Sequence, residues 1–283
     1  MKSEQQPFIG LIGCGWLGRP LAQQLIVSGH RVLGTTTRAT GLSSLLAMDV
    51  EAIQWSLARQ AYQDWLAASS VAMLDACRQC DWVVINIPPK RRDLKITYFM
   101  ANLKALCSHV LNDNPHIRLI FVSTTSVFGE IEGDVDETTP VAPATPSAEL
   151  HVNIENFLLQ TYPTQTVVLR LGGLIGLDRH PVTSICRRES FIQGEQRVNL
   201  IHQADAIGIL QAIFSSAPCG QILHGVAPAH PSRLAFYQRS AKRRGLIFPT
   251  VISSENQTLG KIVHAQKTQQ MLGYTYQFPN IDH

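Results

Sequence analysis

Short apolar runs alternate along the first 170 residues with longer segments in which apolar residues recur at helical spacing. The short runs predict strands, and the segments of helical period predict the helices that join them. We expect strands at 8–12, 31–36, 52–55, 81–87, 118–123 and 166–171, and helices at 16–27, 41–48, 62–77, 96–111 and 145–160. Strict alternation predicts parallel strands with right-handed crossovers, and therefore a doubly wound α/β fold.

The predicted domain boundary follows from where the alternation of strands and helices ends. The runs 82–85 and 119–122 are apolar without interruption, which is typical of central strands covered on both faces. After Gly173 the pattern breaks into shorter pieces separated by prolines, with helices expected at 204–214 and 233–243 and a strand at 221–226. We expect a large domain at 1–177, to which 199–226 returns, and a smaller region at 178–283 that closes one end of the sheet.

The amino-acid composition limits the kinds of partner that the chain is expected to bind. Charged residues make up 16% of the chain, against roughly 25% in an average soluble domain, which favours an oligomer with covered surface. The 24 basic and 21 acidic residues leave a net charge of +3, too small a surplus to predict binding to nucleic acid or to a membrane. The start of the chain lacks the pattern of a secretory signal, and six scattered cysteines do not form a dense disulfide framework. We expect a cytoplasmic protein with reduced thiols.

Residues 13–18 read Gly-Cys-Gly-Trp-Leu-Gly, and they stand between the first predicted strand and the first predicted helix. In this G-x-G-x-x-G pattern, Gly13 permits a tight turn, Gly15 lets a pyrophosphate approach the backbone, and Gly18 lets the helix pack closely. The alternative is a tight turn that binds no nucleotide. The motif in this context predicts a Rossmann-type dinucleotide site, formed by Gly13, Cys14, Gly15, Trp16, Leu17 and Gly18.

The end of the second strand indicates which dinucleotide is bound. An NAD site has an acidic residue about 20 positions after the glycines, but residues 34–38 read Gly-Thr-Thr-Thr-Arg. Arg38 suits a 2′-phosphate, and the Thr36 hydroxyl can add a hydrogen bond, so we predict NADP. The alternative is a solvated Arg38 after β-prone threonines, with NAD as the cofactor. Ile87 and Pro88, at the carboxyl end of the fourth strand, complete the predicted cofactor contacts.

Several motifs together resemble one family. They are the glycine loop, the run Ser-Thr-Thr-Ser-Val-Phe-Gly at 123–129, Asp-Glu-Thr-Thr-Pro at 136–140, Leu-Arg-Leu-Gly-Gly-Leu-Ile-Gly at 169–176, and the segment 199–205. The chain resembles the extended short-chain dehydrogenase/reductase superfamily of NAD-dependent epimerase/dehydratase type, in its atypical G-x-G-x-x-G form. The resemblance implies a nicotinamide cofactor, a small C-terminal substrate-binding region, and a homodimer formed through the helices at 96–111 and 145–160.

The family's catalysis requires a Ser/Thr, a tyrosine acid/base, and a lysine four residues after that tyrosine. Thr124 matches the Ser/Thr position, with Thr125 and Ser126 as neighbouring candidates for substrate binding. The tyrosine position holds Ser147 or Ala148, depending on a one-residue choice of register. No tyrosine in this sequence is followed four residues later by a lysine. The usual acid/base pair is therefore absent.

Other residues are candidates to replace that pair or to bind substrate. His151, at the lysine position in one register, can carry a proton near neutral pH, although a lone helical histidine is more often structural. Lys90, in a basic run after the fourth strand, can bind an anionic substrate or be merely solvated. Arg179 and His202 lie in segments that the family closes over its substrate. Cys77 and Cys80 lack a second ligand pair, so we expect core packing and no metal site.

Two classes of function remain. The first is an NAD(P)-binding oxidoreductase or epimerase that acts on a small polar substrate of the nucleotide-sugar kind. The second is an NADP-binding regulator or sensor without turnover, which the missing Tyr/Lys pair favours. The retained Thr124 and the closing segments favour an enzyme. A structural protein without nucleotide would require the glycine loop to be fortuitous.

Overall fold

The protein is described by a computed structural model that covers residues 6–57, 68–87, 96–252 and 258–281. The chain divides into two compact units, and each contains segments from distant parts of the sequence. Unit 1 comprises Met1–Ser123, Glu149–Val168 and Ala217–Gln221, and unit 2 comprises Thr124–Ala148, Leu169–Ser216 and Ile222–His283. The predicted boundary near residue 177 remains a prediction.

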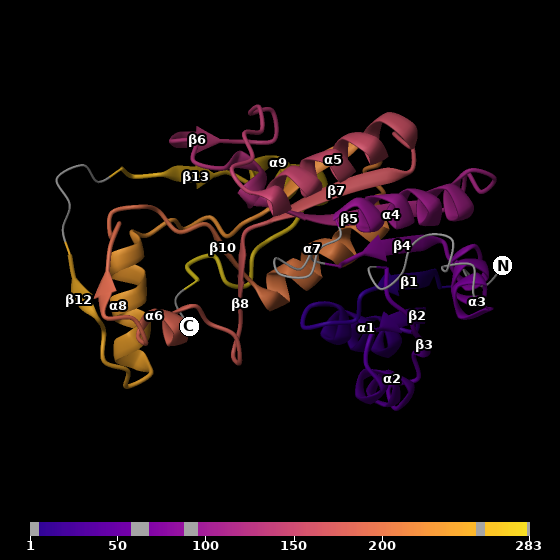
Figure 1. Ribbon diagram of the computed structural model, residues 1–283, viewed down its shortest axis with the longest axis horizontal. Coiled ribbons are helices and arrows are strands. Elements are labelled where there is room, and N and C mark those ends of the chain that lie inside the picture. Colours follow the sequence, from indigo (N-terminus) through magenta and orange to yellow (C-terminus); the bar gives the residue numbers. More distant parts are fainter. Residues whose placement is uncertain (1–5, 58–67, 88–95, 253–257, 282–283) are drawn as a thin grey trace. The chain divides into compact units, whose positions relative to one another are not determined.

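The alternating part of the sequence forms the elements that its pattern predicts, as Figure 1 shows. Strands β1, β2 and β7 and helix α4 have the predicted ends, and the other predicted ends lie within a few residues of those observed. The exception is the start of the helix expected at 62–77, which lies outside the described residues. The elements are β1 (Phe8–Ile12), α1 (Gly18–Val27), β2 (Arg31–Thr36), α2 (Ala39–Leu46), β3 (Glu51–Gln54), α3 (Ala68–Cys77), β4 (Trp82–Ile85), α4 (Ile96–Leu111), β5 (Arg118–Thr124), α5 (Pro146–Thr161) and β7 (Thr166–Leu171).

Within the described residues, the central sheet has seven strands in the order β11-β7-β5-β4-β1-β2-β3, where β11 is Gln221–Gly225. Strand β1 pairs in parallel with β2 and β4, β2 pairs with β3, and β4 pairs with β5. The chain thus adds strands outward from β1 in both directions, so the strand order reverses between β1 and β4. This arrangement confirms the predicted doubly wound, Rossmann-type α/β fold.

Both faces of the sheet in unit 1 are covered, which explains its uninterrupted apolar strands. Successive side chains of a strand point to opposite faces. Ile12, Val83 and Ile85 pack into a cluster with buried side chains of α3, α4 and α5, including Met73, Leu103, Cys107, Ile154 and Leu158. The intervening residue Val84 is equally buried, and Figure 1 shows α4 on one side of these strands and α1 on the other. Apolar residues are therefore required at every position.

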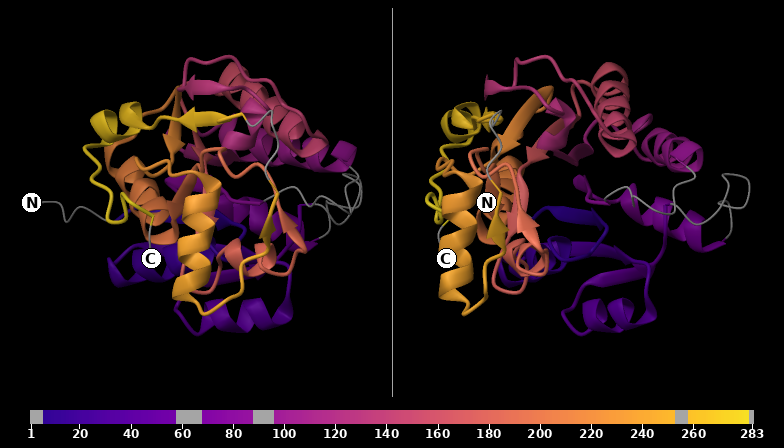
Figure 2. Two further views of the ribbon diagram at one scale, coloured as in Figure 1. Left: turned by 90° about the vertical axis from the view of Figure 1, so that its left-hand side faces the viewer. Right: turned by 60° about the vertical axis from the view of Figure 1, so that its left-hand side comes forward.

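Unit 2 is built from shorter elements. It contains β6 (Gly133–Val135), β8 (Gly173–Ile175), α6 (Val182–Ile185), β9 (Ser190–Phe191), β10 (Leu200–His202), α7 (Gln203–Ser216), α8 (Arg233–Arg243), β12 (Thr250–Val251), β13 (Lys261–Val263) and α9 (Gln266–Leu272). Strand β8 pairs with β10, β9 with β12, and β6 with β13. Helix α8, which is orange in Figure 2, packs its buried Phe236 and Tyr237 in one cluster with Ile185 and Phe191.

The described residues contain neither a membrane-spanning helix nor a metal-binding cluster. No helix there is both long and apolar enough to cross a membrane. The same residues contain no cluster of three or more histidine, cysteine or acidic side chains suited to a metal ion. Cys77 and Cys107 are buried in the apolar cluster of unit 1, and burial raises the pKa of each thiol to about 12. Cys77 packs the core as expected, and so does Cys80 in the same cluster. The raised pKa values make Cys77 and Cys107 poor nucleophiles.

Candidate functional site

The glycine loop lies at the carboxyl end of β1, where the strand order reverses and where open α/β sheets bind their ligands. Gly13 has a φ of +107°, and a Cβ there would lie 2.5 Å from the backbone oxygen of Asn86. A Cβ on Gly18 would lie 2.5 Å from the oxygen of Gly13. The fold itself therefore requires these two glycines, one for the turn and one for the approach of α1.

Gly15 has a different reason to lack a side chain. It is exposed, and a Cβ built on it would meet no described protein atom within 4 Å. Neither packing nor a positive φ demands glycine at this position. A ligand that approaches the backbone closely does demand it, because a side chain would fill the space that the ligand needs. The open space above Gly15 thus fits a pyrophosphate.

Helix α1 presents its amino-terminal end to this loop. Its N-cap residue is Leu17, which provides no side-chain cap, and the first turn contains no acidic residue. The backbone N–H groups at a helix start carry a partial positive charge and favour a bound phosphate. A helix end without a protein anion or cap is the arrangement that a dinucleotide site requires.

Two residues that the sequence analysis did not select hold the loop in place. The Thr35 hydroxyl accepts a hydrogen bond from the Gly13 N–H at 2.9 Å, and the Thr35 carbonyl accepts one from the Cys14 N–H at 2.8 Å. The Asn86 amide, just after β4, donates to the Gly13 oxygen at 3.1 Å. The loop is thus fixed to the strands on both sides of β1. A polar residue at the carboxyl end of β4 was the available signal for Asn86.

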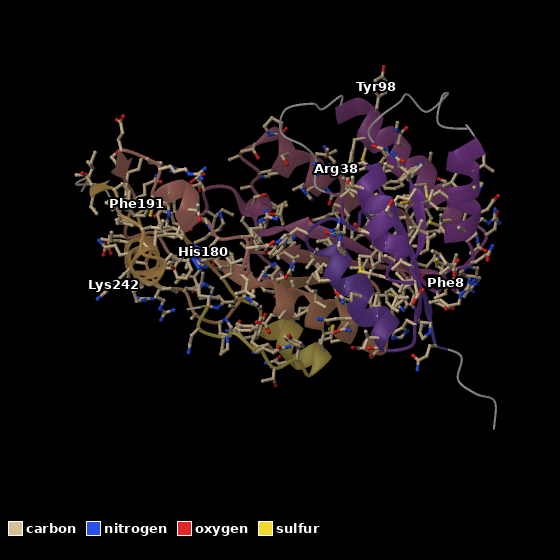
Figure 3. All side chains as sticks on the ribbon, turned by 90° about the horizontal axis from the view of Figure 1, so that it is seen from below. Phe8, Arg38, Tyr98, His180, Phe191 and Lys242 are labelled. Atoms are coloured by element: carbon tan, nitrogen blue, oxygen red, sulfur yellow. The ribbon has the colours of Figure 1, made fainter. Side chains whose placement is uncertain are left out.

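The end of β2 carries the residues predicted to choose the cofactor. Arg38 is exposed and occupies the N-cap position of α2, and Figure 3 labels it. The Arg38 N–H lies 3.5 Å from the Thr36 hydroxyl oxygen, which accepts it. A Cβ on Gly41 would lie 2.3 Å from the same oxygen. Thr36 is half-buried against α2, whereas Arg38 is exposed.

The remaining predicted cofactor contacts lie close to the same loop or outside the described residues. Ile87 is half-buried, and its Cγ1 lies 3.1 Å from the Cβ position of Gly13. Cys14 is buried, its thiol donates to the Leu11 carbonyl at 3.7 Å, and burial raises its pKa to about 12. Cys14 thus serves the loop through its backbone. Pro88 and Lys90 lie outside the described residues.

From Thr124 onward the Ser/Thr run belongs to unit 2, where it forms a short 3₁₀ turn at Thr125–Phe128. The Thr124 hydroxyl accepts a hydrogen bond from the Ser126 N–H at 3.2 Å, which caps this turn. Thr125 is buried, whereas Ser126 is exposed. The cap leaves the Thr124 hydroxyl hydrogen available to donate to another oxygen.

His151 lies in unit 1, on α5, in a buried polar cluster. Its Nδ1 lies 3.4 Å from the Ser123 hydroxyl, which in turn donates to Glu155 Oε1 at 2.5 Å. Burial lowers the pKa of His151 to about 4, so the imidazole is neutral at pH 7. Ser123 and Glu155 were not selected from the sequence, because their contact joins residues 32 positions apart.

The other predicted substrate residues lie in unit 2. His202 Nδ1 accepts a hydrogen bond from the Ala204 N–H at 3.2 Å, at the start of α7, and its ring lies 3.8 Å from that of Phe278. A nitrogen that accepts from an N–H carries no proton, so Nε2 carries the hydrogen of the neutral His202 ring. Arg179 is exposed and lies between β8 and α6.

Comparison with known proteins agrees with this geometry. The chain is 32% identical over 272 residues to protein YeeZ of Escherichia coli K12, which covers 96% of each chain. A conserved protein of unknown function from Silicibacter pomeroyi has a similar structure, with a TM-score of 0.77 and 21% identity over 97% of this chain and 95% of the other. UDP-glucuronic acid 4-epimerase from Bacillus cereus, solved in complex with NAD, has a TM-score of 0.72 and 18% identity over 96% and 93%.

The family match extends over most of the chain. Residues 11–213 match the NAD dependent epimerase/dehydratase family. That range contains the glycine loop, the Ser/Thr run and His151, so the match includes the motifs on which the resemblance rested. The chain belongs to the NAD dependent epimerase/dehydratase family.

Proposed function

We propose that this protein is an NADP-preferring oxidoreductase or epimerase that acts on a small polar substrate of the nucleotide-sugar class. The single observation that carries the proposal is Gly15, where the fold leaves open space above a bare backbone at the switch point of the sheet. Membership of the family and the similarity to a nucleotide-sugar epimerase favour the same substrate class.

The residues around the loop have distinct roles in this proposal. The amino terminus of α1 binds the pyrophosphate, and Arg38 pairs with a 2′-phosphate on the adenosine ribose. The nicotinamide of a bound cofactor accepts or returns a hydride. We assign cofactor contacts to Gly13, Cys14, Gly15, Trp16, Leu17, Gly18, Thr36, Arg38, Ile87 and Pro88.

Substrate is held by hydroxyl and cationic side chains. Thr124 donates to a substrate oxygen, because its own oxygen already accepts from Ser126. His151 moves the proton that the missing tyrosine would otherwise move. We assign further substrate contacts to Thr125, Ser126, Lys90, Arg179 and His202.

The cofactor step is tested by calorimetric titration of the purified chain with NADP and with NAD. The wild type should bind NADP more tightly, and Gly15→Val should lose binding because its side chain occupies the space of the pyrophosphate. The variant should keep its circular dichroism spectrum, since a Cβ at Gly15 meets no described atom within 4 Å. Absence of NAD(P) binding by the folded wild type would contradict the proposal.

The chemical step is tested with a panel of nucleotide sugars in the presence of NADP or NAD. Oxidation is followed by nicotinamide absorbance, and epimerisation by separation of the products, since epimerisation consumes no net cofactor. The absence of a Tyr/Lys pair favours the alternative of a regulator that binds NADP without turnover. Tight NADP binding with no product from any nucleotide sugar would establish that alternative.

A further inference from the structure

Ser123, His151 and Glu155 form a chain of polar groups inside unit 1. Their exposed fractions are 4%, 6% and 2%, so water does not compete for their hydrogen bonds. Ser123 stands near the carboxyl end of β5, and the other two residues are one helical turn apart on α5. Buried groups of this kind are costly unless they are paired. Unit 1 retains three of them, at the carboxyl end of β5 and on α5.

The distances determine where the hydrogens lie. Ser123 Oγ and Glu155 Oε1 are 2.5 Å apart, and two oxygens this close share a hydrogen in a charge-assisted bond. A carboxylate has no hydrogen to offer, so the Ser123 hydroxyl supplies it. Ser123 Oγ then has only a lone pair to present to His151 Nδ1, 3.4 Å away. The hydrogen of the neutral imidazole must therefore be on Nδ1, which leaves Nε2 as the basic nitrogen.

We propose that Ser123 and Glu155 are positioning residues that hold His151 as its Nδ1–H tautomer and relay a proton away from it. This inference rests on the proposed function for His151. When Nε2 takes a proton from the substrate, the Nδ1 proton passes to Ser123 Oγ, and the Ser123 proton passes to Glu155 Oε1. His151 ends neutral as its Nε2–H tautomer, Glu155 ends protonated, and the negative charge has moved to the substrate.

Burial explains why such a relay is needed. The pKa of His151 is lowered to about 4, so an imidazolium is unfavourable at neutral pH. A histidine that took a proton and kept it would have to bear that charge in the interior. Passing a proton to Glu155 removes the charge from the ring. The chain is thus a substitute for the absent Tyr/Lys pair, built from different residues.

The tautomer of His151 is measured directly by ¹⁵N nuclear magnetic resonance on the uniformly labelled protein, without cofactor or substrate. Loss of one imidazole signal set in His151→Gln assigns the ring. The wild type should show a protonated Nδ1 and a bare Nε2. A bare Nδ1 in the wild type would overturn the proposal, because the Ser123 hydrogen would then point to the histidine.

Variants of Glu155 and Ser123 test the two hydrogen bonds that hold the tautomer of His151. Glu155→Leu removes the acceptor, so the Ser123 hydroxyl should turn to Nδ1 and His151 should switch to its Nε2–H tautomer. The circular dichroism spectrum of Glu155→Leu reports whether the variant keeps its fold. Ser123→Ala should remove the preference for either tautomer, whereas Ser123→Thr, which keeps the hydroxyl, should retain Nδ1–H. An unchanged tautomer in folded Glu155→Leu would contradict the proposal.

The same variants separate this inference from the proposed function. On a substrate identified by the nucleotide-sugar panel, Ser123→Ala should lower kcat on the order of 10²-fold, because it breaks the relay. KM should be unchanged, and Ser123→Thr should restore the rate. If the panel yields no turnover, the proposed function fails while the tautomer result stands. A normal kcat in Ser123→Ala, despite a changed tautomer, would overturn the relay.

Discussion

The exposed guanidinium of Arg38 determines the expected choice between the two nicotinamide cofactors. It stands at the start of α2, and the described end of β2 carries no acidic side chain to bind a free ribose hydroxyl. A charge-assisted hydrogen bond is worth roughly 1.5–3 kcal/mol, so Arg38→Ala should weaken NADP binding by about 10- to 100-fold. Binding of NAD should hardly change.

Calorimetric titration of both cofactors measures this difference. Arg78→Ala is a matched control, because Arg78 is an exposed arginine that follows α3. Tighter binding of NAD than of NADP by the wild type would reverse the assignment.

His180 should make unit 2 sensitive to acid. Its Nδ1 accepts from the Val182 N–H at 3.2 Å, its ring stacks on Phe236 at 5.4 Å, and burial lowers its pKa to about 4. Because the pKa of His180 is lower in the folded protein than in the unfolded chain, the unfolded chain binds a proton at a higher pH than the folded protein does. Stability is therefore unaffected by this group above pH 6.5 and falls as the pH drops from about 6.5 to 4.

The variant His180→Asn removes the titrating ring and keeps an oxygen that can accept from Val182. Urea unfolding at pH 7, 6, 5 and 4.5 should show a smaller loss of stability in the variant than in the wild type. Parallel curves for the two proteins would contradict the role of His180. Figure 3 labels this residue together with Phe191.

Also at the residue scale, residues that act within one short segment could be predicted from the sequence. Residues that act through contacts with distant parts of the chain were harder to predict. The glycine loop could be predicted because its three glycines follow one another between a strand and a helix. Thr35 and Asn86 were not selected, since their bonds to Gly13 span 22 and 73 residues; only the polar residue at the end of β4 pointed to Asn86. Glu155 likewise looks like an ordinary helical acid until α5 packs beside Ser123.

At the scale of elements, burial decides what a pattern can predict. Strands such as β4 are apolar at every position because helices cover both faces, and this produces a clear signal. Strands β9 and β12 have two residues each and are defined by pairing between positions 60 residues apart. Two residues cannot show a period, so these strands of unit 2 were not predicted.

Asp205, in the first turn of α7, connects this helix to the C-terminal segment. It is fully buried, and its carboxylate accepts from the Tyr274 hydroxyl at 2.9 Å and from the backbone N–H groups of Gln277 and Phe278 at 2.7 and 3.0 Å. Asp205→Ala removes the acceptor of these three hydrogen bonds, and a hydrogen bond to a charged group is worth about 1.5–3 kcal/mol.

Hydrogen exchange at the Gln277 and Phe278 amides should therefore accelerate more in Asp205→Ala than at the amides of β1. Asp113→Ala is the control, because Asp113 is exposed in the turn after α4. Unchanged protection at the two amides would show that other contacts hold the segment.

At the scale of the whole molecule, we expect a homodimer formed through α4 and α5. The low charge content favours it, and a two-fold interface would place the same surface on each subunit. Light scattering at micromolar concentration should give a mass near twice 31.3 kDa. A mass of one chain would contradict the interface.

The pairing of early with late segments affects how the protein is made on the ribosome. Lys261 binds the Gly129 carbonyl across 132 positions, and His264 binds Asp134 at 2.5 Å across 130 positions. Strand β6 therefore stays unpaired with β13 until residues 261–263 have left the exit tunnel. At roughly 5–20 residues per second, 130 residues correspond to about 7–26 seconds of translation. During that interval the nascent chain exposes the unpaired edge of β6, so the β6–β13 pair of unit 2 forms only late in synthesis.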